Sequence, residues 1–324
     1  MGIQAVGIGT GVADMLLNID KLPGYNENAN LLMQSNQYGG KVATAMAAVG
    51  RLGMECAIIG VIGDDVWGHA QLRDYARSGV NTEHQIIDPN GGTILSVVLS
   101  DREGSRNFLG NGNPNKQRCR PLRVEDLDET MIRNAKGLLL DKDGDPQRAA
   151  AQWIRQSGGV VCFDADVYTE GRESMIPYTD AFIPSEFYYK ERYGEGTPVE
   201  DALRDIVSRG AKTAIITLGE RGLVGLSQGE FFTLPAFSVD VVDTTGAGDV
   251  FHGAYLYGMI KGFSVVECAR FASAVSAIKC SSIGGRSALP TYEIAKEFME
   301  TGRLDRGWID ERVRYYMQPF EMQK

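Results

Sequence analysis

The sequence predicts an α/β protein in which helices cover both faces of a mostly parallel sheet, with a small second sheet inserted. Two observations support this fold class. Short, continuously apolar runs alternate with helix-like segments through most of the 324 residues, and strands buried on both faces of a parallel sheet have that composition. Two stretches, residues 26–38 and 91–110, interrupt the alternation and have strand character with no helix after them.

The elements of the main body follow from these runs in order. The expected strands, which are all short and apolar, cover residues 4–9, 56–63, 137–141, 159–166 and 212–219. The expected helices, which are amphipathic or rich in small residues, cover residues 41–53, 66–79, 146–157, 199–209, 250–261, 265–281 and 291–301. Asp64 and Asp65 are candidate caps for the second helix. The final "RVRYYMQPFEMQK" is expected to be either a loosely held tail or a contact segment.

The interrupting stretches predict a lid. Residues 91–110 have the pattern of a hairpin with its turn at "DREGS", and residues 26–38 supply a further strand. A small sheet that projects from an α/β body is well placed to close over a ligand. We therefore expect one domain over residues 1–324, with a discontinuous lid formed by residues 12–38 and 91–112.

The composition argues against several classes of protein. The net charge is −9 and the pI is about 5.0, which disfavours binding to nucleic acid through its phosphates. The five cysteines form no CxxC pair, and no two of the three histidines have metal-ligand spacing, which disfavours a zinc site. Signal-peptide patterns and apolar runs of about 20 residues are also absent from the sequence. We expect a reduced, cytoplasmic protein with no nucleic-acid or membrane partner.

The most specific pattern is the string "DTTGAGD" at residues 243–249, between a strand-like run at 237–242 and a helix. The first amides of a helix have no internal partners and favour an anion, and small residues let the anion approach them closely. Asp249 stands where it could accept a proton from a hydroxyl beside that anion. Together these features indicate phosphoryl transfer. A capped helix after a glycine turn is the plain structural alternative, and the length of the string favours the catalytic interpretation.

Two other nucleotide motifs do not match. The opening "GIGTG" at residues 7–11 would need glycine in place of Val12 to give GxGxxG, and a poor helix former follows it, which disfavours a nicotinamide oxidoreductase. A Walker-type loop around "SNQYGGKV" would need glycine at Ser35 and Ser or Thr at Val42. The opening glycines are instead expected to end the first strand and to lead the chain to Asp14.

Two signatures make the chain similar to the PfkB, or ribokinase-like, family of carbohydrate kinases. They are "YGGKVATAMAAVGRLG" at residues 38–53 and "VDTTGAGDVFHGAY" at 242–255, and "TLGERG" at 217–222 matches the family's nucleotide-side loop. The resemblance covers nearly the whole chain and implies a ribokinase-like, three-layer α/β/α sandwich with a small β lid. It also implies an ATP-dependent sugar kinase that uses Mg²⁺, with a bound monovalent cation such as K⁺ in many members.

The resemblance assigns roles to the residues that match the family pattern. Asp249 resembles the catalytic base, and the amides of Gly246, Ala247 and Gly248 would form the anion hole. The expected sugar contacts are Asp14, Gly39, Gly40, Lys41, Thr44, Arg106 and Asp141. The expected nucleotide contacts are Ser185, Glu186, Thr217, Gly219, Gly222, Gly246 and Gly248. The expected monovalent-cation ligands are Asp243 and Thr245 with the backbone of Cys280, Ile283 and Gly285.

Some positions depart from the ribokinase pattern. Ribokinase-type members carry Asn-x-x-Glu near Mg²⁺, whereas this chain has "PSEFYY", with Tyr188 in the last acidic position. Thr44 stands where ribokinases have a sugar-contacting asparagine, which disfavours ribose. The C-terminal half looks most like the ketohexokinase and sulfofructose kinase branch. The places of that branch's sulfonate-binding residues fall near Ala29 and Asp143, so we expect a small neutral ketose as substrate.

Other functions remain open at this point. Within the family, the alternatives are a nucleoside kinase and a ribokinase, and a phosphofructokinase would need a cationic pocket for a sugar phosphate. Outside it, Tyr188 suggests a catalytically silent sugar-binding regulator, against which the intact Asp249 argues. The expected partners are a sugar and ATP, and apolar lid residues predict a homodimer joined through the lid: Leu31, Leu32, Leu95 and Val97.

Overall fold

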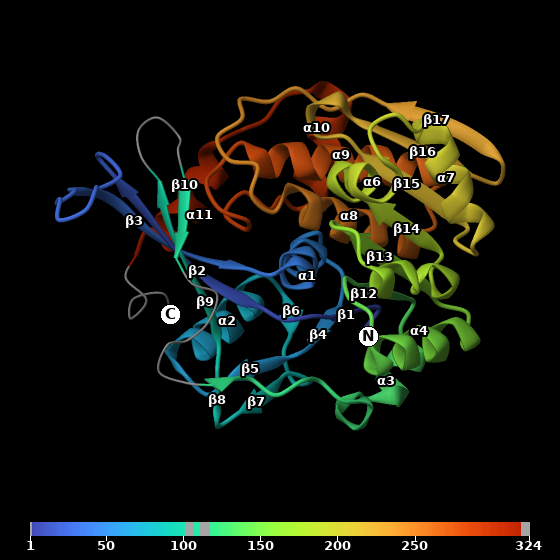
Figure 1. Ribbon diagram of the computed structural model, residues 1–324, viewed down its shortest axis with the longest axis horizontal. Helices are drawn as coiled ribbons and strands as arrows, with labels where there is room; N and C mark the ends of the chain where they lie inside the picture. The colour runs from blue at the N-terminus through green and yellow to red at the C-terminus, as the bar shows by residue number, and fades with distance from the viewer. Residues whose placement is uncertain (1, 101–105, 110–116, 319–324) are drawn as a thin grey trace.

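A nine-stranded sheet forms the centre of the molecule. The computed structural model describes residues 2–100, 106–109 and 117–318, and the strand order is β17-β16-β15-β14-β13-β12-β1-β4-β6 (Figure 1). The strands are β1 (Ala5–Ile8), β4 (Cys56–Ile59), β6 (Val80–Asn81), β12 (Gly137–Leu140), β13 (Val160–Ala165), β14 (Ala181–Pro184), β15 (Thr213–Thr217), β16 (Leu223–Ser227) and β17 (Glu230–Leu234). The β15–β16 and β16–β17 pairs are antiparallel and the others are parallel. In a parallel sheet, ligands bind at the edge where the carboxyl ends of the strands meet.

Helices form a layer on each face of this sheet (Figure 1). One layer contains α1 (Lys41–Arg51), α8 (Ala247–Lys261), α9 (Val265–Cys280) and α10 (Tyr292–Thr301), and the other contains α3 (Glu129–Asn134), α4 (Asp145–Gln156), α6 (Glu186–Tyr193) and α7 (Val199–Ser208). Along β1, Ala5 packs into the first layer, whereas Val6 and Ile8 pack into the second. Both faces of the strand are therefore buried, which explains its unbroken apolar sequence and confirms the three-layer sandwich.

A separate sheet of four strands forms the lid, in the order β10-β9-β2-β3. Its strands are β2 (Val12–Ile19), β3 (Leu31–Gly39), β9 (Ile94–Ser100) and β10 (Arg106–Leu109), and Figure 1 shows it projecting from the body beside α11 (Gly307–Tyr316). Both predicted lid segments contribute strands to it. The predicted hairpin turn at 101–105 and the end of the lid at 110–112 lie outside the described residues.

The remaining elements are short or lie at the margins of the sandwich. They are α2 (Val66–Arg77), α5 (Glu170–Glu173), the single turns at Val124–Asp126, Ile176–Tyr178 and Gly219–Arg221, and two ladders that pair β5 (Val61–Gly63) with β7 (Ile86–Asp88) and β8 (Gly91–Gly92) with β11 (Gln117–Arg118). Among the residues with a described placement, no helix combines the length and apolar character that crossing a bilayer requires.

Two predicted elements differ from the structure, and the C-terminal segment follows the second of its two predicted alternatives, a contact segment. The run 56–63 is divided at Gly60, with β4 in the main sheet and β5 in a small ladder. The run 237–242 is not a strand, because the Val242 amide donates to the carbonyl of Cys280, the last residue of α9 (2.8 Å), and not to a neighbouring strand. The C-terminal segment is not a loose tail as far as Tyr316, since α11 buries Tyr316 against Tyr38 of the lid.

Candidate active site

Two helices begin side by side at the sheet edge. α1 starts after Gly40 and α8 starts after Gly246. The helices pack so closely that a Cβ added at Gly253 would lie 2.3 Å from the Ala45 carbonyl oxygen. Gly40 has φ of 90°, and a Cβ there would lie 2.3 Å from the Thr10 carbonyl oxygen. Glycine at these positions therefore brings two positively polarised helix N-termini to the end of β1.

The first turn of α8 presents free amides. Gly246 takes a left-handed conformation with φ of 76°, which turns the chain into the helix. The Ala247 amide donates to the Thr244 carbonyl at 3.1 Å, whereas the amides of Gly246, Gly248 and Asp249 have no partner among the described residues. Three unpartnered amides at a helix start form an anion site, although the Ala247 amide predicted for it is already engaged.

Asp249 lies on this first turn with a carboxylate that makes no hydrogen bond to any described residue. Burial raises its pKa to about 7, and the neighbouring charge of Asp164 adds to the effect. A carboxyl group with a pKa near neutrality is suited to accept a proton from a hydroxyl at physiological pH. Position, free oxygens and pKa agree with the base predicted from the sequence.

Asp14 and the glycine pair meet on the other side of this space. Asp14 lies on β2, and a Cβ added at Gly39 would lie 2.3 Å from its Oδ2 atom. Burial raises the pKa of Asp14 to about 7, while Arg286 lowers it and Asp249 raises it. Asp14 and Asp249 therefore interact electrostatically, which places the predicted sugar contact and the predicted base around one volume.

Arg286 is a component of this region that sequence reasoning missed. Its side chain is fully buried, and its guanidinium donates to Asp74 (2.6 Å), to the Gly39 carbonyl (2.8 Å) and weakly to the Thr44 hydroxyl (3.4 Å). Asp74 in turn accepts from the Tyr316 hydroxyl at 2.8 Å. Arg286 thus fixes two predicted sugar-contact residues and connects them to α11. The sequence feature that could have indicated this role is the arginine of "GGRSALP", which directly follows the predicted cation ligands.

Carboxylates gather at the ends of β12 and β13. Asp164 is buried, and burial raises its pKa to about 8. Asp166 forms ion pairs with Lys41 and with Arg172, the latter at 3.4 Å. Asp141 is buried, burial raises its pKa, and its Oδ1 atom has no hydrogen-bond partner. The Asp141 oxygen is therefore an open acceptor for a sugar hydroxyl or a metal-bound water.

His252 connects α8 to the sheet beneath the base. Its Nδ1 atom lies 2.6 Å from the Gly248 carbonyl oxygen and 3.5 Å from Asp164, and its Nε2 atom lies 3.1 Å from the Ile183 carbonyl oxygen. Burial lowers the pKa of His252, against the opposing effect of the two carbonyls. The ring therefore connects the first turn of α8 to β14, about one helical turn after Asp249.

Five of the predicted nucleotide contacts lie around the ends of β14 and β15: Ser185, Glu186, Thr217, Gly219 and Gly222. Ser185 and Thr217 form a parallel bridge between strand ends, and Glu186 and Gly219 line a broad hollow of about 740 Å³. Gly222 closes the adjoining turn, where its carbonyl accepts the Leu218 amide at 2.8 Å. The geometry brings the predicted residues together at one surface of the sheet edge.

Glu186, a predicted nucleotide contact in the stretch that matches the family's Mg²⁺-side motif, has both carboxylate oxygens engaged and does not fit a magnesium site. One of its oxygens pairs with Lys190 at 2.6 Å and the other with Arg221 at 2.7 Å. The Ser185 hydroxyl caps α6 and also donates to the Asp166 carbonyl. No group of three His, Cys, Asp or Glu residues within the described ranges could hold a metal.

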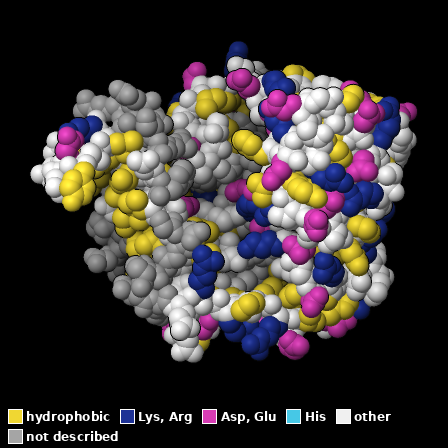
Figure 2. All heavy atoms as spheres, in the orientation of Figure 1, with side chains coloured by type: hydrophobic (Ala, Val, Ile, Leu, Met, Phe, Trp, Pro, Cys, Tyr) yellow, Lys and Arg dark blue, Asp and Glu magenta, His cyan; other side chains and the backbone are white. Residues whose placement is uncertain are grey.

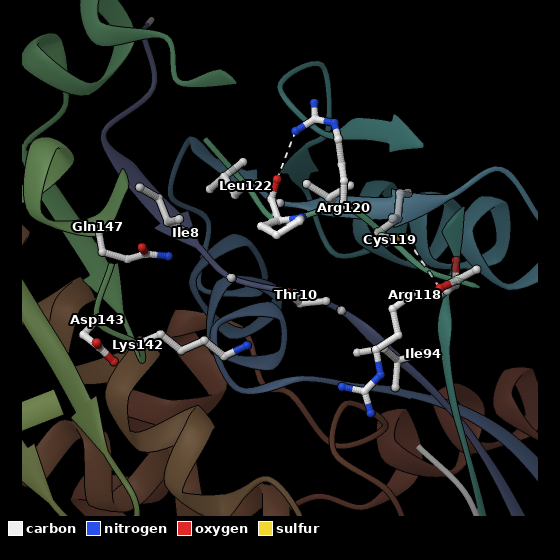
Figure 3. A pocket seen from close by; sticks show the side chains of 18 residues that line it. Ile8, Thr10, Ile94, Arg118, Cys119, Arg120, Leu122, Lys142, Asp143 and Gln147 are labelled. Carbon is white, nitrogen blue, oxygen red and sulfur yellow. Dashed lines mark hydrogen bonds between the residues drawn. The ribbon is translucent and has the colours of Figure 1, made fainter. Parts of the chain in front are cut away.

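A cavity of about 340 Å³ adjoins the end of β1 (Figure 3). Lys142 and Arg118 extend toward Thr10 from opposite sides of it, whereas Arg120 turns away to pair with Asp126 at 2.6 and 2.8 Å. Ile94 also lines the cavity, and it pairs with a β2 residue two positions before Asp14, on the same face of the lid. Two residues of a strand span about 7 Å, so the part of the cavity that Ile94 lines lies about that distance along β2 from Asp14, the predicted sugar contact.

Arg106 begins β10 in the lid, and its side chain lies outside the described part of the structure. The predicted monovalent-cation ligands lie near one another, since the Gly284 amide donates to Asp243 and the Cys280 carbonyl accepts the Asp243 amide.

The chain is similar to known sugar kinases in sequence and in structure. The chain is 28% identical to a probable fructokinase-5 of Arabidopsis thaliana (81% of this chain, 88% of that protein) and 28% identical to an ATP-dependent ribose-1-phosphate kinase of Halopiger xanaduensis (88% and 94%). It superposes on the Arabidopsis thaliana ribokinase, solved with ribose and ATP, with a TM-score of 0.79, 24% identity and coverage of 93% and 99%.

The fold and the site define a carbohydrate phosphotransferase of the ribokinase-like class. The model of the pfkB family carbohydrate kinases matches residues 7–292. The chain belongs to this family and is an ATP-dependent sugar kinase, as the sequence predicted.

Proposed function

We propose that Asp249 is the general base that starts transfer of the γ-phosphate of ATP to a sugar hydroxyl. The observation that carries this proposal is a carboxylate with a pKa of about 7 beside three unpartnered helix amides. Asp249 takes the hydroxyl proton as the sugar oxygen forms its bond to the γ-phosphorus, and the bond from that phosphorus to the β–γ bridging oxygen breaks to release ADP. The amides stabilise the negative charge on the transferring group.

The other site residues position the reactants. Asp14, the Gly39–Gly40 turn and Thr44 hold sugar hydroxyls, and the lid closes over them to exclude water. Thr217, Gly219 and Gly222 border the nucleotide. Mg²⁺ neutralises charge on the ATP phosphates in such reactions, and Asp141 is the carboxylate placed to hold one of its waters or a sugar hydroxyl.

The cavity beside β1 favours an acceptor with an acidic group. Lys142 makes no ion pair with any described residue, and Arg118 approaches the same space from the lid side (Figure 3). The Lys142 ammonium in this cavity can pair with a phosphate or carboxylate. This observation supports a sugar phosphate or sugar acid over the neutral ketose expected from the sequence.

A coupled assay of ADP release tests both the activity and the acceptor class. The acceptors are a ketose, an aldose, a sugar acid, a nucleoside and the phosphorylated form of each sugar. We expect acceptor-dependent ADP release, with a kcat/KM for the acidic sugars at least about tenfold above that for the parent sugars. Lys142→Met should lower that ratio, and Lys296→Met, on exposed α10, should leave it unchanged.

Two outcomes would contradict the proposal in different ways. Binding of sugars without ADP release from any acceptor would support a silent sugar-binding regulator. Preference for a nucleoside, or for each neutral sugar over its acidic counterpart, would retain the kinase and reject the acidic acceptor.

A further inference from the structure

Three of the five predicted monovalent-cation ligands, Asp243, Cys280 and Ile283, already accept hydrogen bonds from the chain itself. Asp243 is buried, and its two carboxylate oxygens accept the amides of Thr245 at 2.9 Å and Gly284 at 2.8 Å. The Cys280 carbonyl accepts two backbone amides, at 2.8 and 3.2 Å, and the Ile283 carbonyl accepts a serine hydroxyl. A carbonyl that receives two donors has no lone pair left for a metal ion. The oxygens that would bind K⁺ are therefore largely engaged.

A cation of the protein's own lies at the same place. Lys279, on the last turn of α9, is fully buried, and its ammonium donates to the Asp243 carbonyl at 2.6 Å. Burial raises the pKa of Asp243, but the Thr245 amide and the Lys279 charge outweigh that effect and lower it. A buried ammonium is costly unless it is paired, and here the ionised Asp243 is its counter-charge.

Further cationic side chains hold the loop that follows. Arg306 donates to the Ser281 carbonyl at 3.0 Å, and Arg312 donates to the carbonyls of Ser287 (3.0 Å) and Arg286 (3.1 Å). Five carbonyls of this stretch thus accept from donors that the chain supplies, namely those of Cys280, Ser281, Ile283, Arg286 and Ser287. A K⁺ ion placed on the Asp243 carbonyl would also meet the like charge of Lys279 within a few ångströms.

We infer that the Lys279 ammonium takes the place of the monovalent cation, so that the protein works without K⁺ or Na⁺. Lys279 acts through Asp243, at the start of the string "DTTGAGD", and ties that string to the loop after α9. It is a positioning residue for the amides before Asp249, because a shift of Asp243 would move the turn that carries them. The activity readout of this inference rests on the proposed kinase reaction, whereas the stability readout does not.

The first test uses the wild-type protein in tetramethylammonium, sodium or potassium chloride at equal ionic strength. We expect initial rates of ADP release to agree within about twofold, and melting temperatures to agree in the three salts. Activation by K⁺ of about tenfold or more, or a melting temperature that rises with K⁺, would overturn the inference. The melting experiment needs no acceptor, so it decides the question even if the kinase proposal fails.

The second test removes the ammonium. Lys279→Met should lower kcat at least about tenfold in tetramethylammonium and make both kcat and melting temperature depend on K⁺ or NH₄⁺, because the freed Asp243 carbonyl and the negative charge of Asp243 can then attract a cation to the place of the ammonium. Lys296→Met is the matched control and should respond to neither ion. Full activity of Lys279→Met in tetramethylammonium would overturn the inference. If Lys279→Met does not fold, refolding in NH₄Cl supports the inference, and equal failure in every salt contradicts it.

Discussion

At the scale of single residues, the site contains several buried carboxyl groups, and burial raises the pKa of each of them. Burial raises the pKa of Asp14 and Asp249 to about 7 and that of Asp164 to about 8. The sequence indicated Asp249 and Asp14, because each stands in a motif. It gave no sign of the contact between Asp164 and His252, since those residues are far apart in the chain and meet when β13 packs under α8.

These pKa values predict the pH dependence of the reaction. Asp249 must be ionised to accept the proton, and Asp14 must be ionised to accept a hydroxyl hydrogen bond. Because both pKa values are raised to about 7, kcat/KM should fall as pH drops below about 7 and level off above about 8. The measurement is kcat/KM for the preferred acceptor from pH about 5.5 to about 9. A profile that is flat down to pH about 5 would contradict this assignment.

At the scale of elements, the small residues of α1 and the C-terminal helix α11 shape the part of the site where the sugar contacts are expected. The run "KVATAMAAVG" packs its small side chains under α8. The sequence pattern predicted both helices, whereas their close approach is seen only in the structure. α11 was not predicted, because its helical stability depends on Tyr316 packing against Tyr38 and bonding to Asp74. Such partners lie more than 200 residues away in sequence, beyond any local pattern.

The link from α11 to the glycine pair predicts a selective kinetic defect. Tyr316→Phe removes the hydroxyl that donates to Asp74, the carboxylate that holds Arg286 against the Gly39 carbonyl. The loss of one buried hydrogen bond costs about 1–3 kcal/mol, and we expect KM for the sugar to rise about three- to tenfold with KM for ATP unchanged. Steady-state kinetics with each substrate varied measures this. Equal increases in both KM values, or a similar effect from Tyr292→Phe on α10, would reject the link.

At the scale of the whole molecule, the lid leaves apolar surface exposed. Leu31 and Leu32, on the edge strand β3, are 55% and 44% exposed, and Figure 2 shows hydrophobic side chains gathered over the lid. Leu95 and Val97 are half-buried, because β9 lies between β2 and β10. The sequence predicted that strands would project from the body. It did not predict which strand forms the edge, since strand order depends on pairing between distant segments.

This surface supports the predicted homodimer through the lid. We expect light scattering after gel filtration to give a mass near twice 35.3 kDa at micromolar concentration, because a second lid would bury these leucines. The double variant Leu31→Lys, Leu32→Lys should give the monomer mass with the fold retained by circular dichroism. A wild-type monomer under these conditions would contradict the prediction.

The central claim is that Asp249 takes the proton of a sugar hydroxyl while ATP is held independently beside it. The most direct measurement compares wild-type protein with Asp249→Asn, using the best acceptor from the screen, with ATP affinity measured by calorimetry. The account predicts that kcat falls at least about 100-fold, in line with the loss of a general base, while the affinity for ATP stays within about twofold. Near-normal turnover in Asp249→Asn would contradict it.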